Sequence, residues 1–222
     1  IYADIYQYMK KEGHFLAALN ADDLKSETKK KVLQNILVAY INGYETLEDE
    51  NSLIGILIGR WNAAELNEII WFVWTVRSRE ENFCKKVQSL WSEISKRIAG
   101  KEEENKNILS SLCQWSVFIP EMNGYIVNLL KQAAPFAEIG YHSYILVEEL
   151  RRLVDHYPLE VADIFISMLQ KFAPTYDEEN IKYILRTLFG KSSLEIRKRA
   201  NEIVDKYIRY GIDFPARLRG EL

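Results

Sequence analysis

The residue types that carry most enzyme chemistry are present in this chain, but their spacings match no known catalytic or metal-binding motif. The three histidines, His14, His142 and His156, form no metal-binding pattern, and no H-E-x-x-H, G-x-S-x-G, Walker A or G-x-G-x-x-G motif occurs. His156 follows Asp155, which would suit a general base oriented by a carboxylate. Its place near a predicted helix end is more typical of a histidine that interacts with the helix dipole.

Carboxylates and thiols show the same structural rather than catalytic character. Acidic residues cluster at 80–81, 102–104, 148–149 and 177–179, and three of these clusters fall in predicted first turns, where negative charge offsets the helix dipole. Cys84 and Cys113 lie in apolar helical patterns and are too few for a disulfide framework or a zinc site, so buried reduced thiols are expected. We therefore predict no catalytic residue, no metal and no cofactor, and keep an enzyme with a dispersed site as the least favoured alternative.

Tryptophans are the residues with the clearest binding potential. Trp61, Trp71, Trp74 and Trp91 crowd into one stretch of the chain. In a helix, Trp71 and Trp74 cannot both share the core face with Ile69, Ile70 and Val73, so one of the two is expected at its edge or on an adjoining surface. An exposed tryptophan would be an anchor for a protein partner. The alternative is that both rings pack against neighbouring helices.

Basic residues gather at the C-terminal end. Residues 181–222 contain ten basic and five acidic residues, a net charge of +5, so the rest of the chain carries −8 and the whole chain −3. The candidate contacts are the run Arg197, Lys198 and Arg199, together with Arg217 and Arg219. Three interpretations remain open: a solvated terminal cap, a surface that docks on an acidic protein, or a contact with nucleic-acid phosphates.

Helical periodicity dominates the chain, and no convincing period-two alternation typical of strands occurs. Apolar stripes at helical spacing run through seven segments; the last contains Ile196, Ala200, Ile203, Val204, Tyr207 and Ile208. Capping-box patterns begin at Asn62, Ser78, Thr175 and Ser192, each followed three residues later by glutamate. Glycines at 100, 140, 190 and 211 stand where helices are expected to end, because glycine tolerates a left-handed conformation. These signals together predict an all-α fold.

The predicted helices group into consecutive antiparallel pairs. The pairs cover about 25–61, 62–99, 100–137, 141–173 and 177–210, with an irregular part at 1–24. Their first helices start roughly 36–40 residues apart, a period found in two-helix solenoid repeats, in which stacking on a neighbour completes each core. The sequence shows no matching residues at fixed repeat positions. A non-repetitive helical bundle is therefore the alternative.

In helix length, pairing and period, the segment from Lys25 to Tyr210 resembles the HEAT and armadillo class of helical repeats. The resemblance is generic, and tetratricopeptide, pentatricopeptide and ankyrin signatures are missing. It implies stacked antiparallel helix pairs in a HEAT-like α–α superhelix, an α-solenoid. Such folds commonly serve as surfaces for other macromolecules, so the resemblance implies a binding role rather than catalysis.

The 222 residues read as one helical repeat domain. The chain starts without methionine inside a predicted helix, which suggests a fragment of a larger protein. No signal peptide and no membrane-spanning segment are visible, and the cysteines suit a reducing compartment, so a cytoplasmic protein is expected. The predicted function is a non-catalytic protein-interaction or scaffold module. The alternative is a nucleic-acid-binding helical repeat that uses its basic C-terminal pair.

Overall fold

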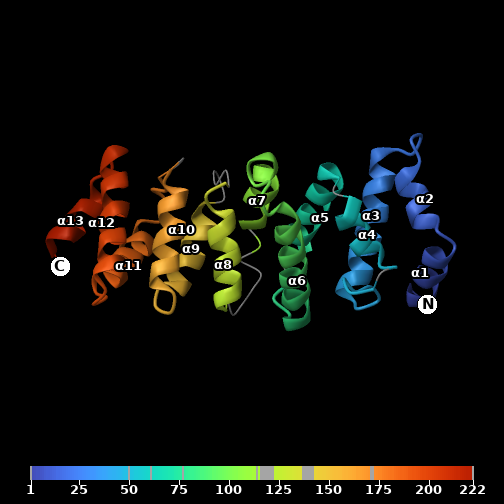
Figure 1. Cartoon of the computed structure of the whole chain (residues 1–222), viewed down its shortest axis with the longest axis horizontal. Coiled ribbons are helices and arrows are strands. Elements are labelled where there is room, and N and C mark those ends of the chain that lie inside the picture. The colour runs from blue at the N-terminus through green and yellow to red at the C-terminus, as the bar shows by residue number, and fades with distance from the viewer. Residues whose placement is uncertain are drawn as a thin grey trace. The chain divides into compact units, whose positions relative to one another are not determined.

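Every regular element in the described part of the chain is a helix (Figure 1). The computed structural model describes residues 2–49, 51–60, 62–76, 78–113, 115, 123–136, 143–170 and 173–221. Within these ranges the chain forms α-helices and one short 3-10 helix, and no strand. The predicted all-α class is therefore confirmed. His142, Gly140 and Trp61 lie outside the described residues.

The chain divides into two compact units, Ile1–Arg97 and Ile98–Leu222. The first unit holds α1 (Tyr2–Lys11), α2 (His14–Asn20), α3 (Ser26–Ile41), α4 (Leu53–Arg60), α5 (Ala63–Val76) and all but the last residue of α6 (Glu81–Ile98). Helix α2 packs against α1 and α3, while α3, α4 and α5 pack against one another. The N-terminal residues expected to be irregular thus form two short helices on the side of α3.

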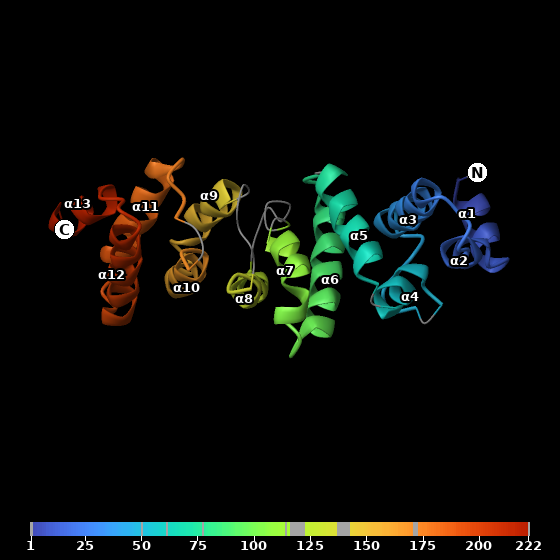
Figure 2. The ribbon, with the colours of Figure 1, turned by 90° about the horizontal axis from the view of Figure 1, so that it is seen from above.

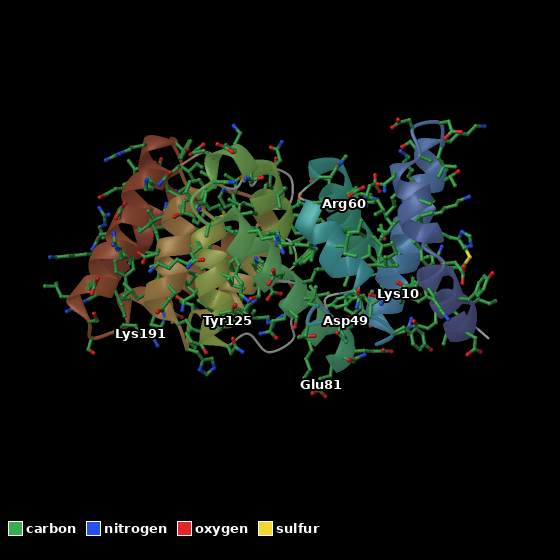
Figure 3. All side chains as sticks on the ribbon, turned by 45° about the vertical axis from the view of Figure 1, so that its right-hand side comes forward. Lys10, Asp49, Arg60, Glu81, Tyr125 and Lys191 are labelled. Carbon is green, nitrogen blue, oxygen red and sulfur yellow. The ribbon has the colours of Figure 1, made fainter. Side chains whose placement is uncertain are left out.

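A buried carboxylate ties α1 to the turn between α3 and α4. The side chain of Glu45 is fully buried, and its Oε1 lies 2.7 Å from Nζ of Lys10 in α1. Its Oε2 accepts a hydrogen bond of 2.8 Å from the backbone N–H of Leu53, the first residue of α4. Lys10 also lies 3.6 Å from Asp49, on the solvent side of the cluster (Figure 3). One anion therefore satisfies a free N–H of α4 and the lysine of α1 at once.

The second unit is built of two layers of helices. It contains η1 (Glu103–Asn105), α7 (Lys106–Cys113), α8 (Gly124–Ala133), α9 (Ser143–Leu153), α10 (Pro158–Met168), α11 (Glu178–Phe189), α12 (Leu194–Arg209) and α13 (Phe214–Glu221). Helices α8, α10 and α12 pack side by side, and α9, α11 and α13 pack likewise. Figure 2 shows these two rows on opposite sides of the unit. From α9 to α11, each helix contacts the next helix in sequence and the helix after that.

Aromatic rings fill the interface between α10, α12 and α13. Phe165 and Tyr207 are both fully buried, with ring centroids 6.2 Å apart, and Tyr207 lies 5.6 Å from the ring of Phe214. The Tyr207 hydroxyl donates to the carbonyl of Pro174 at 3.0 Å, so the loop before α11 is held to α12. Such buried ring pairs contribute through area burial and through edge–face attraction.

Helix ends agree only in part with the expected signals. Asn62 caps α5, since its Oδ1 accepts from the N–H groups of Ala64 and Glu65. Ser193 rather than Ser192 caps α12, and the N-cap of α11 is Asp177 rather than Thr175. The sequence analysis therefore placed the N-cap one residue early in α12 and two residues early in α11, because several polar residues near each helix start could serve as the N-cap.

Two of the expected glycine C-caps adopt the left-handed conformation. Gly100 and Gly211 have φ values of 82° and 73°. Gly190 follows the last residue of α11 as expected, but its φ of −71° is right-handed, so the expected left-handed conformation is wrong there. A Cβ at this position would lie 3.3 Å from the carbonyl oxygen of Arg186, and close backbone approach therefore explains the glycine better than a special φ does.

Three buried tyrosines predict a loss of stability in alkali. Burial raises the pKa of Tyr6, Tyr40 and Tyr207 well above the usual value of 10, and nearby Glu45 raises that of Tyr6 further. The folded state therefore keeps its phenolic protons at a pH where the unfolded chain loses them. Their contribution to stability is complete below about pH 10 and falls as the pH rises above it.

This alkaline loss can be measured by following phenolate absorbance at 295 nm together with far-UV circular dichroism. We expect the last tyrosines to ionise only as the helical signal falls, and Tyr207→Phe to remove part of the loss. If all 13 tyrosines of the chain titrate while the helical signal is unchanged, burial does not protect these hydroxyls.

Candidate functional site

Helix α5 carries the predicted aromatic anchor. Its inner face buries Leu66, Ile69, Ile70 and Val73, and it packs against α3 and α4. The expected core positions 69, 70 and 73 are therefore confirmed. Trp71 points away from this core and is 55% exposed. The side chain of Trp74 lies outside the described residues, so Trp71 is the tryptophan that the structure places on the surface.

The surroundings of Trp71 leave its indole accessible from the solvent side. Along the same face of α5 stand Ala64, Asn67 and Thr75, all exposed and all smaller than the indole. The Thr75 hydroxyl donates to the carbonyl of Phe72 at 2.7 Å, so it is turned back onto its own helix. A large exposed ring on a regular helix presents an apolar projection, a feature that recurs at the centres of protein interfaces.

The helix that carries Trp71 is held in place by an ion pair. Lys30 of α3 lies 2.9 Å from Glu68 of α5, and both side chains are about one-third exposed. Such a partly exposed pair contributes less than about 1 kcal/mol to stability. Its main effect is to fix the rotation of α5 about its own axis relative to α3. Burial of Ile69 and Val73 contributes more. The anchor therefore stands on a helix positioned by core packing.

The predicted basic run on α12 is split by the structure. The guanidinium of Arg199 lies 3.1 Å from Asp163 of α10 and 3.3 Å from Glu202, and Asp163 also pairs with Lys131 of α8 at 2.7 Å. Arg199 is thus part of a chain of ion pairs that crosses α8, α10 and α12. Because successive helical residues are rotated by about 100°, Arg197 and Lys198 face away from this chain. The three residues do not form one surface.

The other predicted basic residues differ in their availability. Arg219 of α13 donates to Asp205 at 2.8 Å and to the carbonyl of Asn201 at 3.0 Å, so it is engaged with α12. Arg197 donates to the carbonyl of Ser192 at 3.4 Å. Lys198 and Arg217 are exposed. The cationic charge that can meet a partner is therefore smaller than the sequence suggests.

Sequence reasoning missed two exposed aliphatic residues on α12. Leu194 and Ile208 are 63% and 42% exposed, although Ile208 was counted in the apolar stripe of this helix. The stripe centres on Ala200, Ile203 and Tyr207, and Ile208 lies about 100° beyond Tyr207. A helical projection that required each member to lie within the buried arc would have excluded it.

The remaining chemical groups show no clustered site. Among the described residues, no group of three or more histidine, cysteine, aspartate or glutamate side chains could hold a metal ion. His14 and His156 are exposed, and they lie in different units. Cys84 and Cys113 form no disulfide and are buried, as predicted, and burial raises the pKa of Cys113 to about 12, so its reactive thiolate form is rare near neutral pH.

In the described ranges, none of the helices combines the length and the apolar character that crossing a bilayer requires.

Comparison of the chain with protein-family models, curated proteins and solved structures finds no match. The geometry described above is therefore what any account of its function has to start from.

Proposed function

We propose that this chain is a non-catalytic interaction module that binds a protein partner, and that Trp71 on α5 is a principal anchor of the contact. The observation that carries the proposal is the exposure of more than half of the indole on a helix whose opposite face is buried. Burying a tryptophan side chain removes a large apolar area from water, which makes this residue type the most enriched at energetic centres of interfaces.

The proposal includes a HEAT-like arrangement of the helices as its framework. In the second unit each of α8, α10 and α12 packs on the next, and α9, α11 and α13 do the same, which supports stacked pairs of the solenoid type. Each predicted range holds two consecutive α-helices. These are α3 and α4 in 25–61, α5 and α6 in 62–99, α7 and α8 in 100–137, α9 and α10 in 141–173, and α11 and α12 in 177–210. A single array through the whole chain stays a prediction, and so does a place in a larger cytoplasmic protein, which the two buried cysteines without a disulfide support.

The anchor is tested by placing a photo-crosslinking amino acid at the exposed position 67, one turn from Trp71 on the same face of α5, so that the indole is kept, and by identifying the protein it captures. The captured partner is then purified and its affinity for the wild-type chain and for Trp71→Ala is measured. We expect Trp71→Ala to weaken binding at least about tenfold, as loss of a central anchor does. The matched control is Tyr176→Ala, which removes an aromatic ring that is 89% exposed in the second unit and should change the affinity less than about twofold.

Two results would refute this role for Trp71. One is a purified partner whose affinity is equal for the wild-type chain and Trp71→Ala. The other is that crosslinking from position 67, with Trp71 in place, captures no protein that binds the purified chain. Circular dichroism of the variant separates a lost contact from a lost fold, because position 71 is exposed and its replacement leaves the core of α5 intact.

Binding of nucleic acid through the basic C-terminal pair is the second candidate, supported by the exposed Lys198 and Arg217. The ion pairs of Arg199 and Arg219 make it the weaker of the two. Retention on heparin or labelled DNA that falls steeply with salt would support it, and unchanged retention after charge reversal of Arg197 and Lys198 would exclude it.

A further inference from the structure

The exposed side of α1 carries an apolar stripe. Ile5 and Tyr8 are 59% and 60% exposed, the highest values among the large apolar side chains described in the first unit. Tyr8 lies about 200° around the helix from the buried Tyr6, and Ile5 lies one turn before Tyr8. The exposed ring of His14 borders the stripe, 6.3 Å from the ring of Tyr8. Adjacent apolar side chains at this exposure mark a surface suited to contact with another protein.

The stripe stands on a helix whose other side is fixed to the first unit. Lys10 of α1 pairs with the buried carboxylate of Glu45 at 2.7 Å. The Tyr2 hydroxyl donates to the carbonyl of Asn35 in α3 at 3.2 Å. These contacts hold both ends of α1 in place, so the stripe faces outward from a positioned helix.

Charged residues flank the stripe in a specific order. Asp4 and Lys11 are both exposed and lie seven positions apart, about 10 Å along the helix. Because seven residues make almost two full turns, they share one edge of the stripe, beside Tyr8. No ion pair of Lys11 is found among the described residues, and Glu12 lies on the opposite edge, beside Ile5. One edge of the stripe therefore has an anion near its start and a cation near its end.

This order of charges is complementary to itself. In an antiparallel pair of α1 helices, Asp4 of each copy lies level with Lys11 of the other, because a two-fold axis across the helices exchanges their ends and keeps the edge. The two Tyr8 rings then meet beside the axis, each next to Ile5 of the other copy. A parallel pair would instead place like charges level with each other. The carboxylate of Asp4 has several acceptor sites, so it can bond to Lys11 of the other copy and to a neighbour in its own.

We infer that two copies of this chain associate through α1, packed antiparallel about a two-fold axis next to Tyr8. The anion and cation on one edge favour this occupant over a uniformly acidic or basic partner, which would meet a charge of its own sign at Asp4 or Lys11. Two-fold dimers that use the same patch on both copies are the commonest closed protein assemblies. The surface does not include Trp71, so this inference and the proposed anchor can fail separately.

The test is sedimentation velocity of the full 222-residue chain between about 1 and about 200 µM, the range in which a contact through one helix is expected to dissociate. We expect a shift from monomer to dimer across this range. Ile5→Ser with Tyr8→Ser should weaken the dimer at least about tenfold, because both copies lose their apolar contacts. The matched control Tyr176→Ser removes a more exposed ring from the second unit and should change the dimer affinity less than about twofold.

Exchange of the charges tests the pairing itself. Asp4→Lys alone and Lys11→Glu alone should each weaken the dimer at least about fivefold, because both contacts between the copies then bring like charges together. An equimolar mixture of the two variants should dimerise about as tightly as the wild-type chain, since a pair with one copy of each variant joins opposite charges at both contacts. A role of these residues within one copy predicts no such recovery.

Three results would overturn the inference. The first is a monomer at every concentration. The second is a loss of dimer affinity for Tyr176→Ser or Trp71→Ala equal to that for the Ile5→Ser and Tyr8→Ser pair, which would place the contact elsewhere. The third is a mixture of the charge variants that associates no more tightly than either variant alone. All four substituted positions of α1 are exposed, and circular dichroism of each variant checks the fold. The serine pair keeps both charges, so the apolar and the charged contacts are tested independently.

Discussion

Replacing Phe165 by alanine is expected to lower the free energy of unfolding of the second unit by about 3–5 kcal/mol, the cost of removing a large buried ring and leaving a cavity. Phe165 is fully buried, and its ring faces that of Tyr207 across the interface between α10 and α12. Since most small domains are stable by only about 5–15 kcal/mol, this loss takes a large part of the total. Urea unfolding followed by circular dichroism measures it.

Leu194→Ala is the matched control for this prediction. It also truncates a large apolar side chain in the same pair of helices, but Leu194 is 63% exposed, so its loss should change stability by less than about 0.5 kcal/mol. Equal effects of the two substitutions would show that α12 does not pack on α10 through its aromatic face.

Replacing Lys10 by methionine is the second large expected effect. The substitution leaves the buried carboxylate of Glu45 without its cation, and breaking a buried pair on one side costs about 3 kcal/mol or more. The hydrogen bond from the N–H of Leu53 offsets part of this, because it still stabilises the charged carboxylate. We expect a loss of about 3 kcal/mol in the stability of the first unit, measured by thermal or urea unfolding.

Two comparisons identify the cause of the expected loss. Adding Glu45→Gln to Lys10→Met removes the unpaired charge but keeps an acceptor for Leu53, so the double variant should regain stability. Lys85→Met, which breaks the exposed pair with Glu81 at 2.6 Å, should change stability far less than Lys10→Met does, because water screens this pair. If Lys10→Met is as mild as Lys85→Met, the Glu45 cluster contributes little to the fold.

The fold class follows from the sequence because helical stripes and capping residues act locally. The stripe residues Ile203, Val204 and Tyr207 are buried as the period requires, and Asn62 caps α5 through its own side chain. What the local pattern cannot determine is which helix covers which face. Glu45 reads as a solvent-exposed turn residue in the sequence, and only the approach of α1 with Lys10 makes it a buried anion.

The candidate site, like the fold, was predictable from the sequence only where local helical pattern determines it. The crowding of Trp71 with Ile69, Ile70 and Val73 implied that a tryptophan must leave the core, and the structure identifies Trp71 as exposed. The basic run 197–199 was harder to interpret, since its three side chains point in different directions from α12. The pairing of Arg199 with Asp163 depends on α10, which is distant in sequence, and no local signal reports it.

The layered contacts of α8 to α13 have a consequence for how this unit folds. The main contacts of each described helix in this group are with partners one or two helices away in the chain, so the loops that must close before these contacts form are short. Short closures favour rapid folding, since little chain entropy is lost before packing begins. A helix emerging during synthesis can therefore find its partner among segments already made, and α8 to α11 can assemble before α12 and α13 have left the ribosome.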